Sequence, residues 1–137
     1  LAFAAMAMCL HRAADAADLT IGVKNVQQDA GQVLVGLFSN PESFPKTISQ
    51  GTMASAKERS AAGQVRLIFK GLAAGQYVAT AFHDLDSNGK LSANMFGLPV
   101  EPYGFSNNAR GNFGPPAFKD AAITLGDEDL TIEVTLK

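Results

Sequence analysis

The chain has 137 residues, of which 47% are hydrophobic and 18% are charged, and its formal net charge is −2. This length and composition are typical of one globular domain with its own hydrophobic core. The charge excludes a general attraction to nucleic acids or anionic membranes, and the absence of about eighteen consecutive apolar residues beyond the N-terminus predicts no membrane span in the mature domain.

The N-terminal residues differ in composition from the rest of the chain. An apolar stretch from Leu1 to Leu10 is followed by Ala14-Asp15-Ala16, which has the small-x-small pattern of a signal peptidase site. We therefore expect residues 1–16 to be a truncated export signal and residues 17–137 to be one periplasmic or secreted domain. A disordered or strand-like extension is the alternative. Cleavage would remove the only cysteine, Cys9, and with it disulfide and thiol chemistry.

Period-two patterns predict strands in the first part of the domain. Leu19, Ile21 and Val23 alternate with polar residues, and residues 33–38 form an apolar run. The turn signal at residues 29–32 predicts that these two strands pair as a hairpin. After them, Pro45 limits any helical turn, so we expect a loop there with Phe44 buried.

Further strands are predicted at residues 65–69, 77–83 and 130–136, again from alternation of apolar and polar residues. Tyr77 follows the turn at residues 71–76, where a buried ring can send its hydroxyl to a nearby backbone carbonyl, as in the tyrosine corner of sandwich folds.

Many short strands without a long amphipathic helix predict an all-β fold, an antiparallel β-sandwich of the immunoglobulin-like or transthyretin-like kind. A small barrel is the second choice. The stretch from Asp84 to Lys119 is rich in glycine and proline but also in aromatic residues, so we expect one long ordered loop.

The clearest chemical signal is half of a calcium loop. Asp84, Asp86 and Asn88 place oxygen-bearing side chains at alternate positions, and Gly89 permits the positive φ of a sharp turn. The twelfth position of such a loop requires an acid but holds Met95.

We expect calcium to be held by side chains, one backbone carbonyl and a residue from the following segment, namely Asp84, Asp86, Asn88, the carbonyl of Lys90, and Asn94 or Glu101. Six to eight oxygen ligands are needed. The alternative is a turn without metal, in which Asp84 and Asn88 cap backbone groups.

A second candidate site combines aromatic, amide and basic side chains in Tyr103, Phe105, Asn107, Asn108 and Arg110. Aromatic faces and amides together suit a polar small molecule or a carbohydrate. The alternative is a structured loop whose rings fill the core and whose amides bond backbone groups.

Catalysis has weaker support, because His83, Asp84, Glu101 and Ser106 form no recognised catalytic spacing. We expect His83 to make a structural hydrogen bond at the end of its strand. The sequence thus favours a non-catalytic binding or structural module. The alternative is a hydrolase of a carbohydrate or another polar small molecule, with Asp86 and Glu101 as the paired carboxylates.

Two long motifs, GQYVATAFHDLDSNGKLSAN at residues 75–94 and FGLPVEPYGFSNNARGNFGPPAFKDA at residues 96–121, carry a family resemblance. The chain resembles the bacterial DUF2141 family over about Leu19 to Lys137. The resemblance implies an exported sandwich domain and brings no established activity. Many members carry an acid where this chain has Ser92, which removes one candidate cation ligand.

Overall fold

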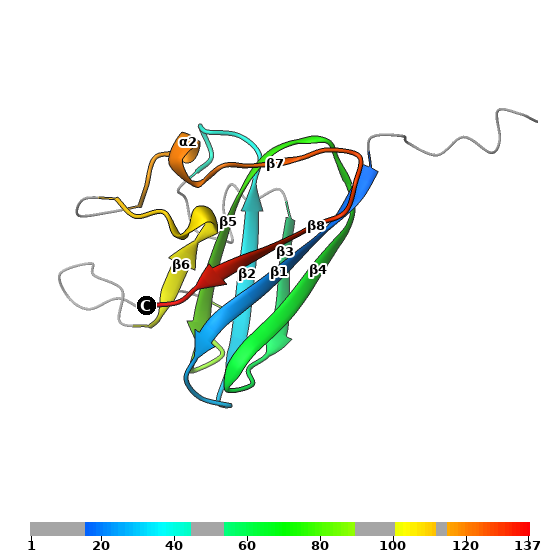
Figure 1. The fold of residues 1–137 in the computed structure, drawn as a ribbon. Coiled ribbons are helices and arrows are strands. Elements are labelled where there is room, and N and C mark those ends of the chain that lie inside the picture. Colours follow the sequence, from blue (N-terminus) through cyan, green and yellow to red (C-terminus); the bar gives the residue numbers. More distant parts are fainter. Residues whose placement is uncertain (1–15, 45–53, 90–100, 112–114) are drawn as a thin grey trace, which may run out of the picture.

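The computed structural model describes residues 16–44, 54–89, 101–111 and 115–137. Two β-sheets pack face to face, which confirms the all-β sandwich predicted from the alternating pattern (Figure 1). The smaller sheet has the order β4-β1-β8. Its strands are β1 (Ala16–Val26), β4 (Gly63–Ala73) and β8 (Leu130–Thr135).

The larger sheet has the order β3-β2-β5-β6, and β7 pairs with the start of β5. Its strands are β2 (Gln32–Phe38), β3 (Ala54–Arg59), β5 (Gly75–Asp84), β6 (Tyr103–Phe105) and β7 (Ile123–Leu125). A 3-10 turn, η1 (Ser106–Asn108), follows β6, and the short helix α2 (Phe118–Ala121) precedes β7. No helix in the described ranges has the length and apolar character needed to cross a membrane.

The main core lies between the two sheets. Leu19, Ile21 and Val23 of β1 are fully buried there, as the period-two pattern predicts, and Tyr77 at the start of β5 is buried with them. The Tyr77 hydroxyl donates to the backbone carbonyl of Ala73, which confirms the predicted corner. Burial of each large side chain of this kind stabilises the fold by about 1.5–3 kcal/mol.

A second, smaller core covers part of the outer face of the larger sheet. Phe38 and Val78 are paired across β2 and β5 and belong to this core with the buried Phe44, so the prediction for Phe44 is confirmed. Phe44 makes edge-to-face ring contacts with Phe38, Phe105 and Phe118, at centroid distances of 5.2, 5.9 and 6.2 Å. This aromatic packing holds β6 and α2 against the sheet.

The predicted hairpin between the first two strands is wrong. β1 pairs with β4 and β8, whereas β2 pairs with β3 and β5, so the connection between β1 and β2 crosses from one sheet to the other. Both strands have an apolar face, and facing each other across the core buries both faces at once. The β1–β8 pairing is also parallel, unlike the other pairings, which are antiparallel.

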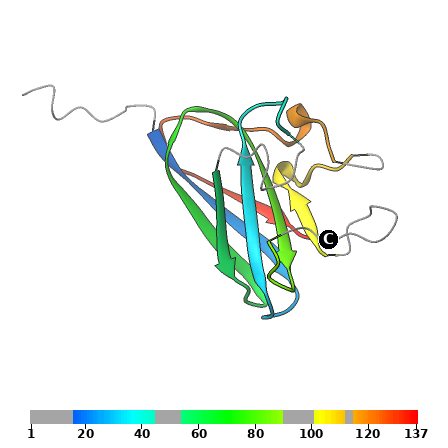
Figure 2. The ribbon, with the colours of Figure 1, turned by 180° about the vertical axis from the view of Figure 1, so that it is seen from behind.

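Part of the predicted long loop is regular structure. Within residues 101–121 the chain forms β6, η1 and α2, which lie together beside β5 (Figure 2). On its other side β6 meets the end of the chain, because the Tyr103 amide donates to the Lys137 carbonyl at 3.2 Å and the Lys137 amide donates to the Tyr103 carbonyl at 3.0 Å. β6 therefore joins the two sheets along one side of the sandwich.

Candidate metal site

The candidate calcium loop starts where β5 ends, and the Asp84 side chain closes it. The amides of Asn88 and Gly89 donate to the two oxygens of Asp84, Oδ1 at 3.1 Å and Oδ2 at 2.7 Å. The Asn88 amide also donates to Oδ1 of Asp86 at 3.3 Å. Gly89 has the positive φ that the sequence pattern predicts, 77°. These bonds are the capping role expected of a tight turn, and they gather the polar residues around one carboxylate.

The base of this loop rests on the connection between β1 and β2. Gln32 Nε2 donates to Asp84 Oδ2 at 2.8 Å, and Nε2 of the buried His83 lies 2.7 Å from the Ala30 carbonyl oxygen. The His83 contact agrees with the structural role predicted for it. Gly31 lies against the Asp84–Leu85 backbone so closely that a side chain would overlap it. Sequence reasoning missed Gln32 and Gly31, because no local pattern links them to a loop fifty-two residues further on.

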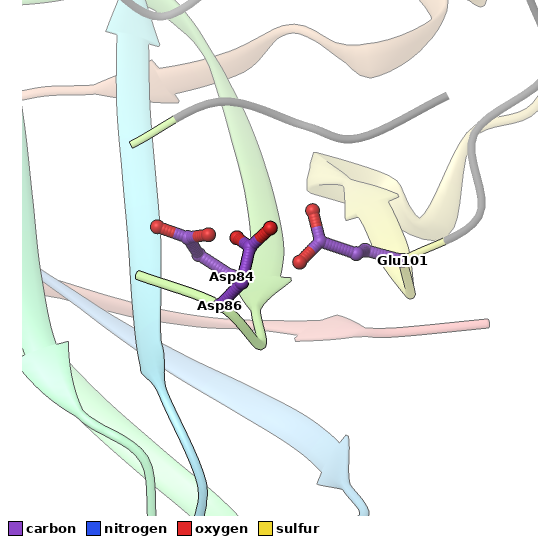
Figure 3. Close-up of side chains that lie close together, drawn as sticks. All are labelled: Asp84, Asp86 and Glu101. Carbon is purple, nitrogen blue, oxygen red and sulfur yellow. The ribbon is translucent and has the colours of Figure 1, made fainter. Parts of the chain in front are cut away.

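Glu101 approaches the loop from the residues that lead into β6. Its Oε2 accepts a hydrogen bond of 2.7 Å from the Leu85 amide, and its side chain is 6% exposed. Figure 3 shows its carboxylate facing those of Asp84 and Asp86. One oxygen from each of the three lies within 4.8 Å of the others. The structure thus brings together three of the predicted ligands from two segments of the chain.

The Asp84 carboxylate is fully buried, yet its environment favours the ionised form. Burial alone raises the pKa of Asp84, but hydrogen bonds from the Gln32 side chain, the Gly89 amide, the Asp86 side chain and the Asn88 amide outweigh it. The pKa is therefore lowered from its usual value. The buried carboxylate remains charged near neutral pH and can act as a metal ligand.

The separation of the carboxylates meets the geometric requirement for a shared calcium ion. Calcium binds oxygen at about 2.3–2.6 Å, so two oxygens on one ion are at most about 5 Å apart. The three carboxylates of Asp84, Asp86 and Glu101 satisfy this limit. Asn88 lies in the same loop, and its backbone amide donates hydrogen bonds to Asp84 and Asp86. Lys90 and Asn94, the two other predicted ligands, lie outside the described residues.

The amides of the second candidate site bond to the protein's own backbone. Asn107 Nδ2 donates to the carbonyls of Ala122 and Asp120, at 2.9 and 3.3 Å, and Asn108 Oδ1 accepts from the Thr135 amide at 3.0 Å. Both asparagines have positive φ, 60° and 50°, a conformation that asparagine tolerates better than most residues. This arrangement matches the structured-loop alternative rather than an open amide-lined groove.

The rings of that segment are half-buried. Phe105 packs on Phe44, and Tyr103 packs on Phe105 with ring centroids 5.9 Å apart. The guanidinium carbon of the exposed Arg110 lies 5.9 Å from the centre of the Tyr103 ring. Stacking of this kind is weakly stabilising at an exposed site. Of the predicted set, Asn107, Asn108 and Arg110 are exposed, whereas Tyr103 and Phe105 are half-buried.

Ser106 was a catalytic candidate by residue type, but its hydroxyl is engaged on both sides. It is fully buried, donates to the Ala121 carbonyl and accepts from the Ala79 amide at 3.0 Å. A hydrolase with paired carboxylates needs one proton-donating acid of raised pKa. The donors around Asp84 favour its ionised form instead, so Asp84 does not meet this requirement.

Comparison with known families gives one result. A family model described as an uncharacterized protein conserved in bacteria, DUF2141, matches residues 21–133. That range includes the three clustered carboxylates and at least part of every strand, from the middle of β1 to the middle of β8. No curated protein and no solved structure matches the chain.

Proposed function

Since the chain belongs to the DUF2141 family, whose description assigns no activity, we propose its function from the site alone. We propose a non-catalytic exported module in which calcium joins the loop after β5 to the segment entering β6. The observation that carries this proposal is the convergence of Asp84, Asp86 and Glu101 within 4.8 Å. Export rests on the apolar N-terminal stretch and the small-x-small pattern at Ala14–Ala16.

Two features support a cation-binding loop over a turn without metal. The buried carboxylates of Asp84 and Glu101 each accept a hydrogen bond from a backbone amide, and the bonds to Asp84 favour its negatively charged form. Charges of like sign held this close repel one another, and a divalent cation removes that repulsion. A site with three carboxylates on two segments suits the weak binding of extracellular modules, with dissociation constants of about 10⁻⁴–10⁻³ M.

Within this proposal calcium has a structural effect. Glu101 lies two residues before β6, and β6 contacts both sheets and the second core. An ion bound to Asp84, Asp86 and Glu101 would hold β6 against the end of β5. The half-buried Tyr103 and the exposed Arg110 beside it would then form a fixed surface for a polar small molecule or carbohydrate.

Calcium titration of the mature domain by calorimetry tests the proposal, with Asp86→Asn as the main variant. Asp86 is exposed, so removing its charge perturbs the fold less than a change at the buried Asp84. We expect saturable binding to the native protein and at least about tenfold weaker binding to the variant, because one charged ligand is lost.

The matched control is Asp129→Asn, which removes an exposed carboxylate that accepts from the Asp18 amide, away from the calcium loop. Its calcium affinity should equal that of the native protein. Absence of saturable binding to the native protein at millimolar calcium, or equal weakening in both variants, would contradict the proposal.

A further inference from the structure

The loop after β5 contains a chemically reactive bond as well as the clustered carboxylates. The sequence has one Asn-Gly pair, Asn88–Gly89, and both residues are exposed. Asparagine side chains are prone to deamidation when glycine follows, because the absence of a Cβ lets the next backbone nitrogen approach the side-chain amide.

The reaction requires a free backbone nitrogen at Gly89. That nitrogen loses its proton and bonds to Cγ of Asn88, the side-chain amide leaves as ammonia, and a five-membered succinimide forms. Water then opens the ring at either carbonyl and gives aspartate or isoaspartate. The net change is addition of water and loss of ammonia, with no oxidant or reductant.

In the folded protein this nitrogen is engaged. The Gly89 N–H donates to Asp84 Oδ2 at 2.7 Å, and the preceding N–H, that of Asn88, donates to Asp84 Oδ1 at 3.1 Å. Asn88 therefore has a fixed amide on each side. Asp84 itself is held by Gln32 and is fully buried, so its carboxylate cannot turn away without disrupting the end of β5.

A carboxylate in this position protects the nitrogen. Hydrogen bonds to charged acceptors are stronger than neutral ones, so loss of the Gly89 proton requires breaking a strong bond. An aspartate carboxylate is also far too weak a base to remove a proton from a peptide nitrogen. We propose that Asn88–Gly89 is a latent site of spontaneous deamidation and that the Asp84 carboxylate slows this reaction in the folded protein by holding the Gly89 N–H. This inference does not rest on calcium binding.

Deamidation of Asn88 would change the loop in one of two ways. Conversion of Asn88 to aspartate adds a negative charge beside Asp84 and Asp86. Conversion to isoaspartate routes the backbone through the side chain and lengthens the loop by one atom, which is incompatible with the hydrogen bonds from Asn88 and Gly89 to Asp84.

The test incubates the native protein and Asp84→Ala at mildly alkaline pH with a chelator, which removes any contribution from bound calcium. Peptide mass mapping measures the replacement of the amide by an acid at residue 88, and enzymatic methylation measures isoaspartate. We expect deamidation in Asp84→Ala to be at least about tenfold faster than in the native protein, because a hydrogen bond to a charged group is lost. Asp84→Asn keeps an oxygen acceptor without the charge and should give an intermediate rate.

Tyr77→Phe is the control for lowered stability, because it removes a hydrogen bond near the other end of β5. At temperatures where it is as destabilised as the Asp84 variants, its deamidation rate should stay close to the native rate. Equal acceleration in Tyr77→Phe would assign the protection to global stability and overturn the proposal. A native rate equal to that of the urea-unfolded chain, or slower deamidation in Asp84→Ala, would overturn it as well.

Discussion

Substitution of Gly31 by alanine should destabilise the domain through two separable effects. Gly31 has φ of +76°, a conformation that costs a residue with a Cβ about 1–2 kcal/mol. The added Cβ would also overlap the Asp84 carbonyl oxygen and lie 2.8 Å from Cα and the carbonyl oxygen of Leu85. Those are backbone atoms at the base of the loop, so relief requires moving the loop, and overpacking of this kind costs about 1–3 kcal/mol. The expected loss in the free energy of unfolding is therefore about 2–5 kcal/mol.

Gly71→Ala is the matched control, since Gly71 has φ of +66° and nothing within 4 Å of an added Cβ. In Gly71→Ala the free energy of unfolding should fall only by the cost of the positive φ, about 1–2 kcal/mol. Alanine also reduces the entropy of the unfolded chain by a similar amount in both variants, so that effect cancels in the comparison. Urea unfolding in the presence of a chelator measures both values. Equal losses in the two variants would show that the Asp84–Leu85 backbone does not depend on Gly31.

Three more predictions concern hydrogen bonds that the structure places in the interior. Ser106→Ala leaves the buried Ala79 amide without its acceptor and should cost about 1–3 kcal/mol by urea unfolding; a loss below experimental error would mean that water or backbone movement replaces the hydroxyl. Tyr77→Phe removes the bond to the Ala73 carbonyl and should cost about 0.5–1.5 kcal/mol, with an unchanged m-value; a changed m-value would indicate altered unfolding cooperativity instead. The lowered pKa of Asp84 means that its contribution to stability is present above the usual pKa of about 3.9 and is lost as pH falls through the lower folded-state value. In chelator, the melting temperature should therefore fall more steeply in acid for the native protein than for Asp84→Asn, and parallel curves would refute this assignment.

The strands and their buried faces could be predicted from the sequence because alternation is a local property. Leu19, Ile21 and Val23 point into the core, and Tyr77 makes its corner bond, as their patterns predict. The pairing of β1 could not be predicted in the same way. A turn signal such as that at residues 29–32 shows where the chain reverses, but whether the next strand lies beside the first or across the core depends on which other strands occupy its edges.

In the candidate site, too, local features could be predicted and most contacts between distant segments could not. The spacing of Asp84, Asp86 and Asn88 identified the loop, and Glu101 was included as a ligand that reaches back to it. The support beneath the loop comes from Gly31, in the connection between the sheets, and from Gln32, the first residue of β2. The turn signal that includes them does not indicate this contact. The amides of Asn107 and Asn108 looked equally suited to a ligand, because sequence gives the chemistry of a side chain but not the backbone group that it already binds.

The parallel pairing of β1 with β8 has a kinetic consequence. Leu19 aligns with Leu130 and Val23 with Val134, so the smaller sheet is complete only after segments more than a hundred residues apart have met. Closing loops of that length is slow, and folds dominated by such pairings reach the native state in about milliseconds to seconds. Until residues 130–136 dock, one edge of β1 lacks its partner, and the nascent chain exposes an apolar strand with free hydrogen-bonding groups. The last strand of the sequence therefore decides how long the first one is exposed to aggregation.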